Sequence, residues 1–338
     1  MMAGRADARI LVASLIAGIG LALLLGVCIG TSDMPLNRVL AALLLQGDVG
    51  DRLVVWSIRL PRALAALVTG VALGLAGAAL QGLLRNPLAE PGVLGVSASA
   101  SLCATIVIYF GLAPLWAWAV PVAAIVGALL ATGFLAFVAL RVGSAVSLIL
   151  VGVGLSSFAG AVMALAMNFA PNPFALSDLV NWMGGSVANR SFEDLGLTVP
   201  FIALGCLVLM RVRHGLSALT LGEEAALGVG LDVRALRLWV VAGTGLVVGG
   251  SVGLAGAIGF VGLICAHLVR PLVQHDPART LLPAGLLGGL VLLCADILVR
   301  VVPSPSELKL GVVAALIGAP VFVWIAARSQ SGAGAANG

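Results

Sequence analysis

The sequence contains few charged residues for its length. Asp, Glu, Lys and Arg make up 9% of its 338 residues, whereas they make up about a quarter of an ordinary soluble domain. Lysine and tyrosine each occur once, and histidine occurs three times. Because so little charge is available for a hydrated surface, the composition excludes a water-soluble fold.

Cysteine is also rare, and its placement predicts no metal site. Each of the five cysteines lies alone in a separate apolar stretch, without a C-x-x-C pair or a histidine at ligand spacing. We expect them to be small packing residues, and we expect this chain to bind no metal or other cofactor. The five are Cys28, Cys103, Cys206, Cys265 and Cys294.

Apolar segments, in contrast, are abundant. Hydrophobic residues make up 61% of the sequence, and uncharged stretches of about 20 residues, the length that crosses a bilayer as a helix, recur along it. The strands of a membrane barrel would alternate polar and apolar residues, and these stretches do not. We therefore predict an all-α integral membrane protein.

Charges, prolines and Gly/Asn clusters divide the chain into ten predicted transmembrane helices of a single domain, 1–338. Pro91 to Leu140 is uncharged over about twice the thickness of a bilayer core, so it must fold back. Leu238 to Ala266 is too long for one helix, so we expect a full span followed by a short helix. The ten helices are expected near 10–30, 62–84, 92–111, 115–140, 144–169, 195–211, 235–256, 257–270, 280–301 and 309–327.

The distribution of basic residues predicts the orientation. An even number of spans places both termini on one side, and with a cytoplasmic N-terminus eleven of the 18 basic residues fall inside and seven outside. This bias follows the positive-inside rule and predicts a multi-pass membrane protein with both termini cytoplasmic. The outside residues run against the rule and need another explanation. They are Arg38, Arg52, Arg59, Arg62, Arg190, Arg300 and Lys309.

Two short segments recur in the sequence. Gly74 to Ala78 and Gly253 to Ala257 share the letters GLAGA. Arg62 to Leu64 recurs as Arg234 to Leu236. The copies lie in the second and the seventh predicted helices, which cross the membrane in opposite directions, so they predict an inverted internal repeat, a common construction in transporters. The 44 glycines also predict that helix backbones approach closely.

The sequence shows no energy source of its own for transport. A nucleotide-binding chain would contain G-x-x-x-x-G-K-[ST], but the only lysine, Lys309, is followed by Leu310. An ion-driven transporter would need ionisable relay residues in the membrane; we interpret Asp296 as a local ion-pair partner of Arg300, and His267 as structural. A membrane enzyme would need a His, Asp or Glu cluster, and the sequence contains none. An ion-gradient-driven secondary transporter of a small solute stays the alternative, and no enzyme is predicted.

The longest polar segment on the predicted cytoplasmic side, Arg211 to Arg237, contains a candidate docking element. Glu223 and Glu224 suit the first turn of a short helix, and Gly228 and Gly230 can end it. Such a helix, held between two spans, would fit a groove on another protein. An ordinary solvated loop is equally consistent with these residues.

Two motifs are more specific, Arg59-Leu60-Pro61-Arg62 and the segment NPLAEPGVLGV from Asn86 to Val96. Further motifs are Asn181-Trp182-Met183-Gly184-Gly185-Ser186, Leu221 to Gly230, Gly259 to Leu263 with His267 and Arg270, Ala295-Asp296, and Gly311 to Pro320. In this order, from about residue 59 to 328, they resemble the FecCD-type permeases, which import ferric siderophores, haem and cobalamin. The resemblance covers nearly the whole chain.

The resemblance implies a type II ABC importer permease of the bacterial cytoplasmic (inner) membrane, with ten helices per subunit. Such a subunit moves a ferric siderophore or a similar metal chelate, such as haem or cobalamin, into the cytoplasm, and the sequence does not say which. Its implied partners are a second permease copy or paralogue, cytoplasmic ABC ATPase subunits that bind ATP and Mg²⁺, a periplasmic or lipid-anchored substrate-binding protein, and the lipid bilayer. No nucleic acid is expected.

The resemblance also implies roles for particular residues. Three external arginines correspond to positions that meet acidic residues of the binding protein, namely Arg59, Arg62 and Arg300. The cytoplasmic coupling segment, about 215–232, includes Gly222, Glu223, Glu224, Ala225, Ala226 and Gly228.

The implied pathway is lined largely by the helices 144–169 and 309–327. Two residues depart from the family pattern, because Ala266 and Lys309 stand where prolines are usual, and Lys309 places a charge near the external mouth. The candidate lining residues are Ser147, Ser156, Ser157, Met163, Met167 and Asn168.

Overall fold

The computed structural model describes residues 3–30, 34–141, 145–302 and 307–334, and all regular structure in these ranges is helical. The helices are α1 (Ala3–Cys28), α2 (Leu36–Leu43), α3 (Val49–Leu53), α4 (Leu60–Leu84), α5 (Val96–Tyr109), α6 (Ala119–Arg141), α7 (Ala145–Asn168), α8 (Pro173–Met183), α9 (Phe192–Ala218), α10 (Glu223–Gly228), α11 (Val233–Ala255), α12 (Val261–Val269), α13 (Pro277–Val301) and α14 (Leu310–Gly334). A π-helical stretch, Val54–Arg59, joins α3 to α4.

Seven described helical segments are long and apolar enough to cross a bilayer, and three shorter apolar helices accompany them. In chain order they correspond to the ten predicted helices, so the predicted all-α membrane architecture is confirmed. The seven are Ala8–Cys28, Val49–Leu84, Ala119–Arg141, Val146–Asn168, Phe192–Leu221, Val233–Ala255 and Pro277–Val301. The three are Val96–Tyr109, Val261–Val273 and Leu310–Val323.

Some helix boundaries differ from the sequence prediction. The short helices α2 and α8, which lie between the long helices, were not predicted. The helix expected at 195–211 continues to Ala218, because Arg211 and Arg213 were read as a boundary although arginine is a good helix former. The predicted coupling segment, 215–232, therefore begins inside α9.

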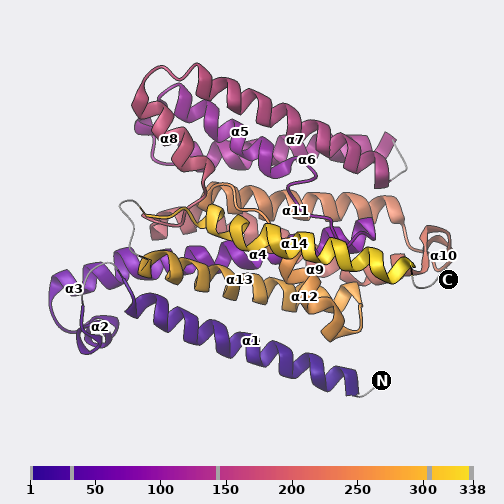
Figure 1. Ribbon diagram of the computed structural model, residues 1–338, viewed down its shortest axis with the longest axis horizontal. Helices are drawn as coiled ribbons and strands as arrows, with labels where there is room; N and C mark the ends of the chain where they lie inside the picture. Colours follow the sequence, from indigo (N-terminus) through magenta and orange to yellow (C-terminus); the bar gives the residue numbers. More distant parts are fainter. Residues whose placement is uncertain (1–2, 31–33, 142–144, 303–306, 335–338) are drawn as a thin grey trace.

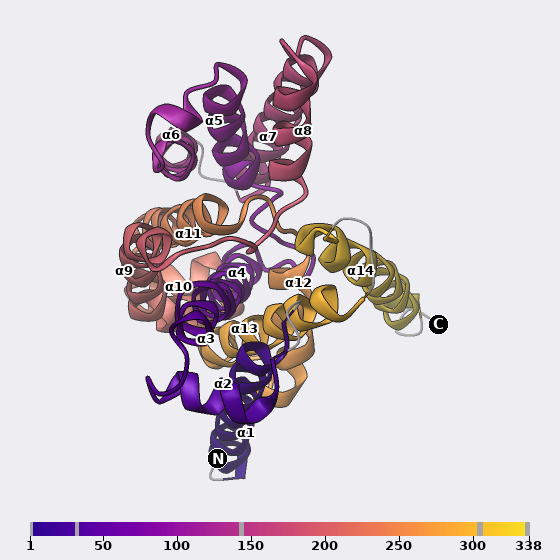
Figure 2. The ribbon, with the colours of Figure 1, turned by 90° about the vertical axis from the view of Figure 1, so that its left-hand side faces the viewer.

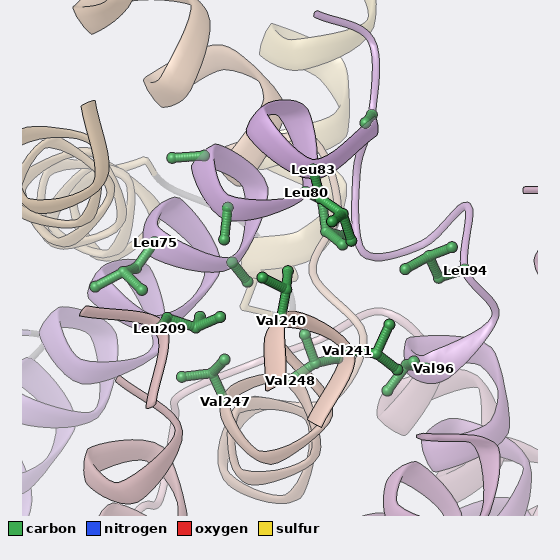
Figure 3. Packing of buried hydrophobic residues seen from close by; sticks show 14 of the residues in the cluster. Leu75, Leu80, Leu83, Leu94, Val96, Leu209, Val240, Val241, Val247 and Val248 are labelled. Atoms are coloured by element: carbon green, nitrogen blue, oxygen red, sulfur yellow. The ribbon is translucent and has the colours of Figure 1, made fainter. Parts of the chain in front are cut away.

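α4 is the central helix of the bundle. In its span, Val49–Leu84, 78% of the most apolar window is buried, against 22% in the α7 span, Val146–Asn168. Seen end-on, α4 is surrounded by α9, α11, α12 and α13, whereas α7 and α14 lie toward the outside (Figure 2). Leucine and valine side chains from α4, α9 and α11 fill the space between these helices (Figure 3).

Glycines bring α4 into backbone contact with its neighbours. A Cβ atom added to Gly70 would lie 2.2 Å from the carbonyl oxygen of Gly288 in α13, and one added to Gly288 would lie 2.2 Å from the carbonyl oxygen of Gly70. A Cβ atom on Gly77 would lie 2.4 Å from the carbonyl carbon of Gly262 in α12. No side chain fits at these contacts, so the predicted close approach of helix backbones is confirmed.

The two copies of the GLAGA repeat have corresponding packing partners. Gly74, in the first copy, contacts α13 at Ala284, whereas Gly253, in the second copy, faces α6 at Pro121. In the order of the long helices, α6 of the first half corresponds to α13 of the second half. Each copy of the repeat thus packs against the corresponding helix of the opposite half, as an inverted repeat requires.

Two irregular segments meet inside the bundle, one between α4 and α5 and the other between α11 and α12. The Glu90 carboxylate accepts a hydrogen bond of 2.9 Å from the backbone N–H of Phe260, just before α12. The Phe260 ring meets Phe322 of α14 edge-on, and Ser156 of α7 donates to the carbonyl oxygen of Gly92 at 2.8 Å. These contacts supply partners to backbone groups outside regular helix, as a lipid environment demands, and they attach α7 and α14 to the core.

α10 lies at the end of the molecule where α1 begins and α14 ends, and α2, α3 and α8 lie at the opposite end (Figure 1). We call these the α10 end and the α8 end. This arrangement agrees with an even number of crossings.

Replacing Gly70 with alanine should force α4 away from α13. We expect the free energy of unfolding to fall by about 1–3 kcal/mol, measured as a lower thermal midpoint of the detergent-purified chain. Gly20→Ala in α1 is the matched control, because nothing lies within 4 Å of a Cβ atom there. Equal midpoints for the two variants would contradict the backbone contact.

Candidate coupling and docking sites

The candidate coupling element is α10, a helix of six residues between α9 and α11. Gly222 begins it with φ +101°, and Gly230, after its end, has φ +84°. Both values lie in the region that glycine adopts without strain. As the sequence predicted, Glu223 and Glu224 lie in the first turn of a short helix.

The two glutamates of α10 have different environments. Glu223 forms an ion pair with Arg237, which is 4% exposed in the second turn of α11. Glu224 is exposed, and it forms no ion pair within the described ranges. Glu223 therefore holds α10 against the bundle, whereas Glu224 is available to a partner.

The remaining surface of α10 is apolar and exposed. Leu227 is 59% exposed, and Leu221 and Val229, just outside the helix, are each 70% exposed. Ala226, on the opposite side, is fully buried in the main core. Exposed apolar side chains grouped beside an acidic one are typical of a protein contact surface.

The base of α10 is braced by neighbouring helices. Ser217, near the end of α9, donates a hydrogen bond to the carboxylate of Asp276. Asp276 also accepts from the backbone N–H of Ala278 at 3.0 Å and so caps α13. These contacts fasten the end of α9, which leads into α10, to the start of α13.

At the α8 end, Asp296 lies between two arginines. Its side chain is 1% exposed and accepts a hydrogen bond of 2.8 Å from Nε of Arg62. Arg300, one turn later in α13, pairs with the other carboxylate oxygen, which confirms the predicted pair. Arg62 also forms an ion pair with Glu307.

Two arginines at this end cap the last turn of α1. Arg59 donates to the carbonyl oxygen of Cys28 at 2.7 Å, and Arg300 donates to that of Gly26 at 2.6 Å. Each donates to a second carbonyl oxygen of this region at 3.0 Å. The last carbonyls of a helix have no intrahelical partner, and the helix dipole favours cations there. This structural role would account for arginines at the end that the sequence predicts to be external.

The docking role of Arg59, Arg62 and Arg300 stays a prediction, and the geometry says what it would require. All three side chains are occupied within the chain. A partner's carboxylate would have to share them with Asp296, Glu307 and the carbonyls of α1. Three guanidinium groups face two carboxylates, so the cluster retains one positive charge (3 − 2 = 1) that can still attract an acidic surface.

The candidate pathway residues of α7 do not share one environment. Met163 is buried inside the single chain, and Asn168 donates to the carbonyl oxygen of Ala164 in its own helix at 2.9 Å. Their role in lining a pathway stays a prediction. The half-buried candidates are Ser147, Ser156 and Met167, and the exposed ones are Ser157 and Asn168.

Sequence reasoning missed three residues that organise these sites. Arg237 was counted only as a topology signal, Glu307 was not considered, and Glu90 was read only as part of a motif. A signal for Glu90 existed, because it is the last ionisable residue before fifty uncharged ones, Pro91 to Leu140. Arg237 and Glu307 meet partners on other elements, and no local pattern indicates such pairing.

A model of the FecCD transport family matches residues 17–328, which is most of the chain. The chain belongs to this family. It is a permease subunit of an ABC importer, a multi-pass membrane protein that is not itself a catalyst.

Similar proteins agree with this assignment. The chain is 40% identical over 309 residues to the vitamin B12 import system permease protein BtuC of Klebsiella pneumoniae, covering 91% of this chain and 90% of the relative. It is 39% identical over 281 residues to the BtuC protein of Yersinia enterocolitica, covering 83% of each. It also resembles an inward-facing structure of a protein classed as a metal-chelate type ABC transporter, with a TM-score of 0.82 and 29% identity over 94% of this chain and 98% of that one. An ion-gradient-driven transporter finds no support in these matches.

Replacing Asp296 with asparagine should leave Arg62 and Arg300 without their shared counter-charge. Because breaking a buried ion pair strands a charge, we expect a loss of about 3–5 kcal/mol in the free energy of unfolding. The measurement is unfolding of the purified chain in mixed micelles.

The control breaks an ion pair that is open to solvent on one side. Asp51, which is mostly buried, pairs with Arg38 at 2.6 Å, but the Arg38 side chain is 52% exposed. Asp51→Asn should cost clearly less than Asp296→Asn, because water solvates the arginine that loses its partner. If Asp296→Asn is no more damaging than Asp51→Asn, the central role of Asp296 is wrong.

Proposed function

We propose that this permease imports cobalamin or a closely related metal chelate into the cytoplasm, driven by ATP hydrolysis on separate ATPase subunits. The observation that supports the substrate most directly is the identity of about 40% to vitamin B12 permeases over nine tenths of both chains. A ferric siderophore or haem is the second candidate, supported by the likeness to a metal-chelate type transporter.

The coupling of ATP hydrolysis to transport is assigned to α10. Its exposed acidic and apolar side chains suit a groove on an ATPase subunit, and its ion pair to Arg237 transmits motion to α11. The α8 end, with its positively charged cluster, is assigned to the external side and to a substrate-binding protein. A second permease copy is expected to cover α7 and α14, which expose many apolar side chains, among them Leu150, Phe158 and Leu316.

The substrate is tested by uptake into proteoliposomes that contain the complete complex with its ATPase and binding protein. We expect ATP-dependent accumulation of radiolabelled cyanocobalamin that stops when ADP replaces ATP. Ferrichrome and haem, added in excess, should compete weakly. Accumulation of ferrichrome or haem without cyanocobalamin uptake would overturn the cobalamin assignment and favour the second candidate.

The docking role of α10 is tested with Glu224→Arg. Glu224 is exposed, whereas Glu223 pairs with Arg237 inside the chain. Reversing the charge of Glu224 alone therefore tests docking without disturbing the folded structure. We expect roughly tenfold weaker binding of the ATPase subunits, which corresponds to about 1.4 kcal/mol, and a matching loss of uptake.

The matched control is Glu193→Arg, an exposed glutamate in the first turn of α9 at the α8 end. It should leave ATPase binding unchanged. If the Glu224→Arg variant binds the ATPase subunits as tightly as the unaltered chain does, the proposal that α10 contacts them is wrong.

A further inference from the structure

A cleft opens at the α8 end, between α8 and the connection from α5 to α6. Its volume is about 590 Å³, within the usual range of small-molecule sites, about 300–1,000 Å³. It lies apart from the α10 surface. Lining residues include Pro114, Pro121, Phe174, Asn181, Arg190 and Lys309.

Arg190 is a half-buried cation that lines this cleft. Its Nε atom is fully buried, and the part of the chain that the structure describes offers that atom no hydrogen-bond partner. Asp194 is near, but it is engaged by Ser191 in the cap of α9 and forms no ion pair with Arg190. Burial lowers the pKa of the Arg190 guanidinium below its usual range. A buried N–H group without a hydrogen-bond partner is costly, so its presence needs a reason.

A second donor in the cleft also lacks an acceptor. The indole Nε1–H of Trp182, which follows Asn181 at the end of α8, is buried and has no hydrogen-bond partner in the described ranges. Buried indole N–H groups usually have a partner. Arg190 and Trp182, which both line the cleft, therefore each keep one buried N–H donor without an acceptor in the described structure.

Like Arg190, the other basic residue that lines the cleft, Lys309, makes the cleft positively charged. Lys309 lines it as a half-buried residue and lies against Gly184. Asp178 is the only carboxylate among the lining residues; it is exposed on α8 and forms no ion pair with Arg190 or Lys309 in the described structure. The cleft therefore has two cations against one carboxylate, and its other polar lining residues, Asn172, Asn181, Ser186 and Asn189, are uncharged.

We propose that this cleft is an entry site for an oxyanion group, a carboxylate or a phosphate, of the imported solute. Arg190 supplies a planar fork of N–H donors that suits such a group, Trp182 supplies a third direction of donation, and Lys309 supplies a mobile positive charge. This inference rests on the proposed function, because the solute is taken to arrive at the α8 end. A phospholipid headgroup has the same chemistry, so the experiment must separate the two sources.

The first test compares two corrinoids in the proteoliposome assay. Cyanocobalamin carries a phosphodiester, and dicyanocobinamide lacks it. In the variant with Arg190→Gln and Lys309→Gln, we expect the preference for cyanocobalamin over dicyanocobinamide to fall at least severalfold, with dicyanocobinamide uptake preserved. Because the binding protein is the same in both complexes, its own preference cancels. Preserved dicyanocobinamide uptake also shows that the variant folds.

Two controls accompany this comparison. Lys309→Arg keeps the charge and should keep the preference. Arg52→Gln removes an arginine of the α8 end that does not line the cleft, and it should change nothing. An unchanged preference in the double variant, or an equal loss of both substrates, would overturn the proposal.

The second test does not depend on the transported solute. Asn181, exposed in the cleft, is replaced by cysteine in a chain whose five native cysteines are serine. Its reaction rates with a sulfonate and a trimethylammonium methanethiosulfonate reagent are each divided by the rate with a free thiol. In phosphatidylcholine nanodiscs we expect the sulfonate reagent to be favoured about tenfold, and we expect the double variant to lose this preference.

The outcomes separate the possible explanations. Absence of the preference in the unaltered cleft would overturn the oxyanion site. A preference that disappears when phosphatidylglycerol is added would assign the site to lipid and overturn the solute assignment. If neither corrinoid is transported but the preference is present, the proposed function fails while the oxyanion site stands.

Discussion

Gly70 and Gly288 allow α4 and α13 to meet backbone to backbone, and the positions of the other sites follow from this contact. It sets the register of the two helices, which brings Arg62 of α4 beside Asp296 of α13 at the α8 end. Toward the other end, Gly77 receives the start of α12 at Gly262. α4 and α13 therefore cannot easily slide past each other. A shift of either helix would separate the buried ion pair and expose backbone groups that lipid cannot hydrogen-bond.

The bundle therefore consists of a tightly packed core and a looser periphery. α4, α11 and α13 form the core with α9, and α10 is fastened to it through Glu223 and Arg237. α7 and α14 are attached more lightly, chiefly through the irregular segments at Gly92 and Phe260. If an ATPase subunit pushes α10, as proposed above, we expect the core to move as one piece and the attachments of α7 and α14 to change. Transport would then be a movement between two packed surfaces rather than a rearrangement of either.

The sequence predicted the helical class, the approximate position of each long helix and the acidic first turn of α10, because these depend on composition and local pattern. Long-range pairing was harder. Arg59, Arg62 and Arg300 were predicted to face a partner, but their arrangement around Asp296 and the end of α1 depends on how distant helices pack. The end of α9 was misplaced because charged residues do not stop a helix that leaves the membrane. The roles of Glu90 and Arg190 could not be predicted, because they depend on whether residues remote in the sequence supply a hydrogen-bond partner.

Hydrogen–deuterium exchange of the complete complex in nanodiscs, with and without ATP, tests the division into core and periphery most directly. We expect the amides of α4 and α13 to stay equally protected in both conditions, because their backbones are locked together at Gly70 and Gly288. The segments around Gly92 and Phe260, together with the adjoining parts of α7 and α14, should change their exchange rates on ATP addition. Altered exchange in α4 and α13, with α7 and α14 unchanged, would contradict the division on which this mechanism rests.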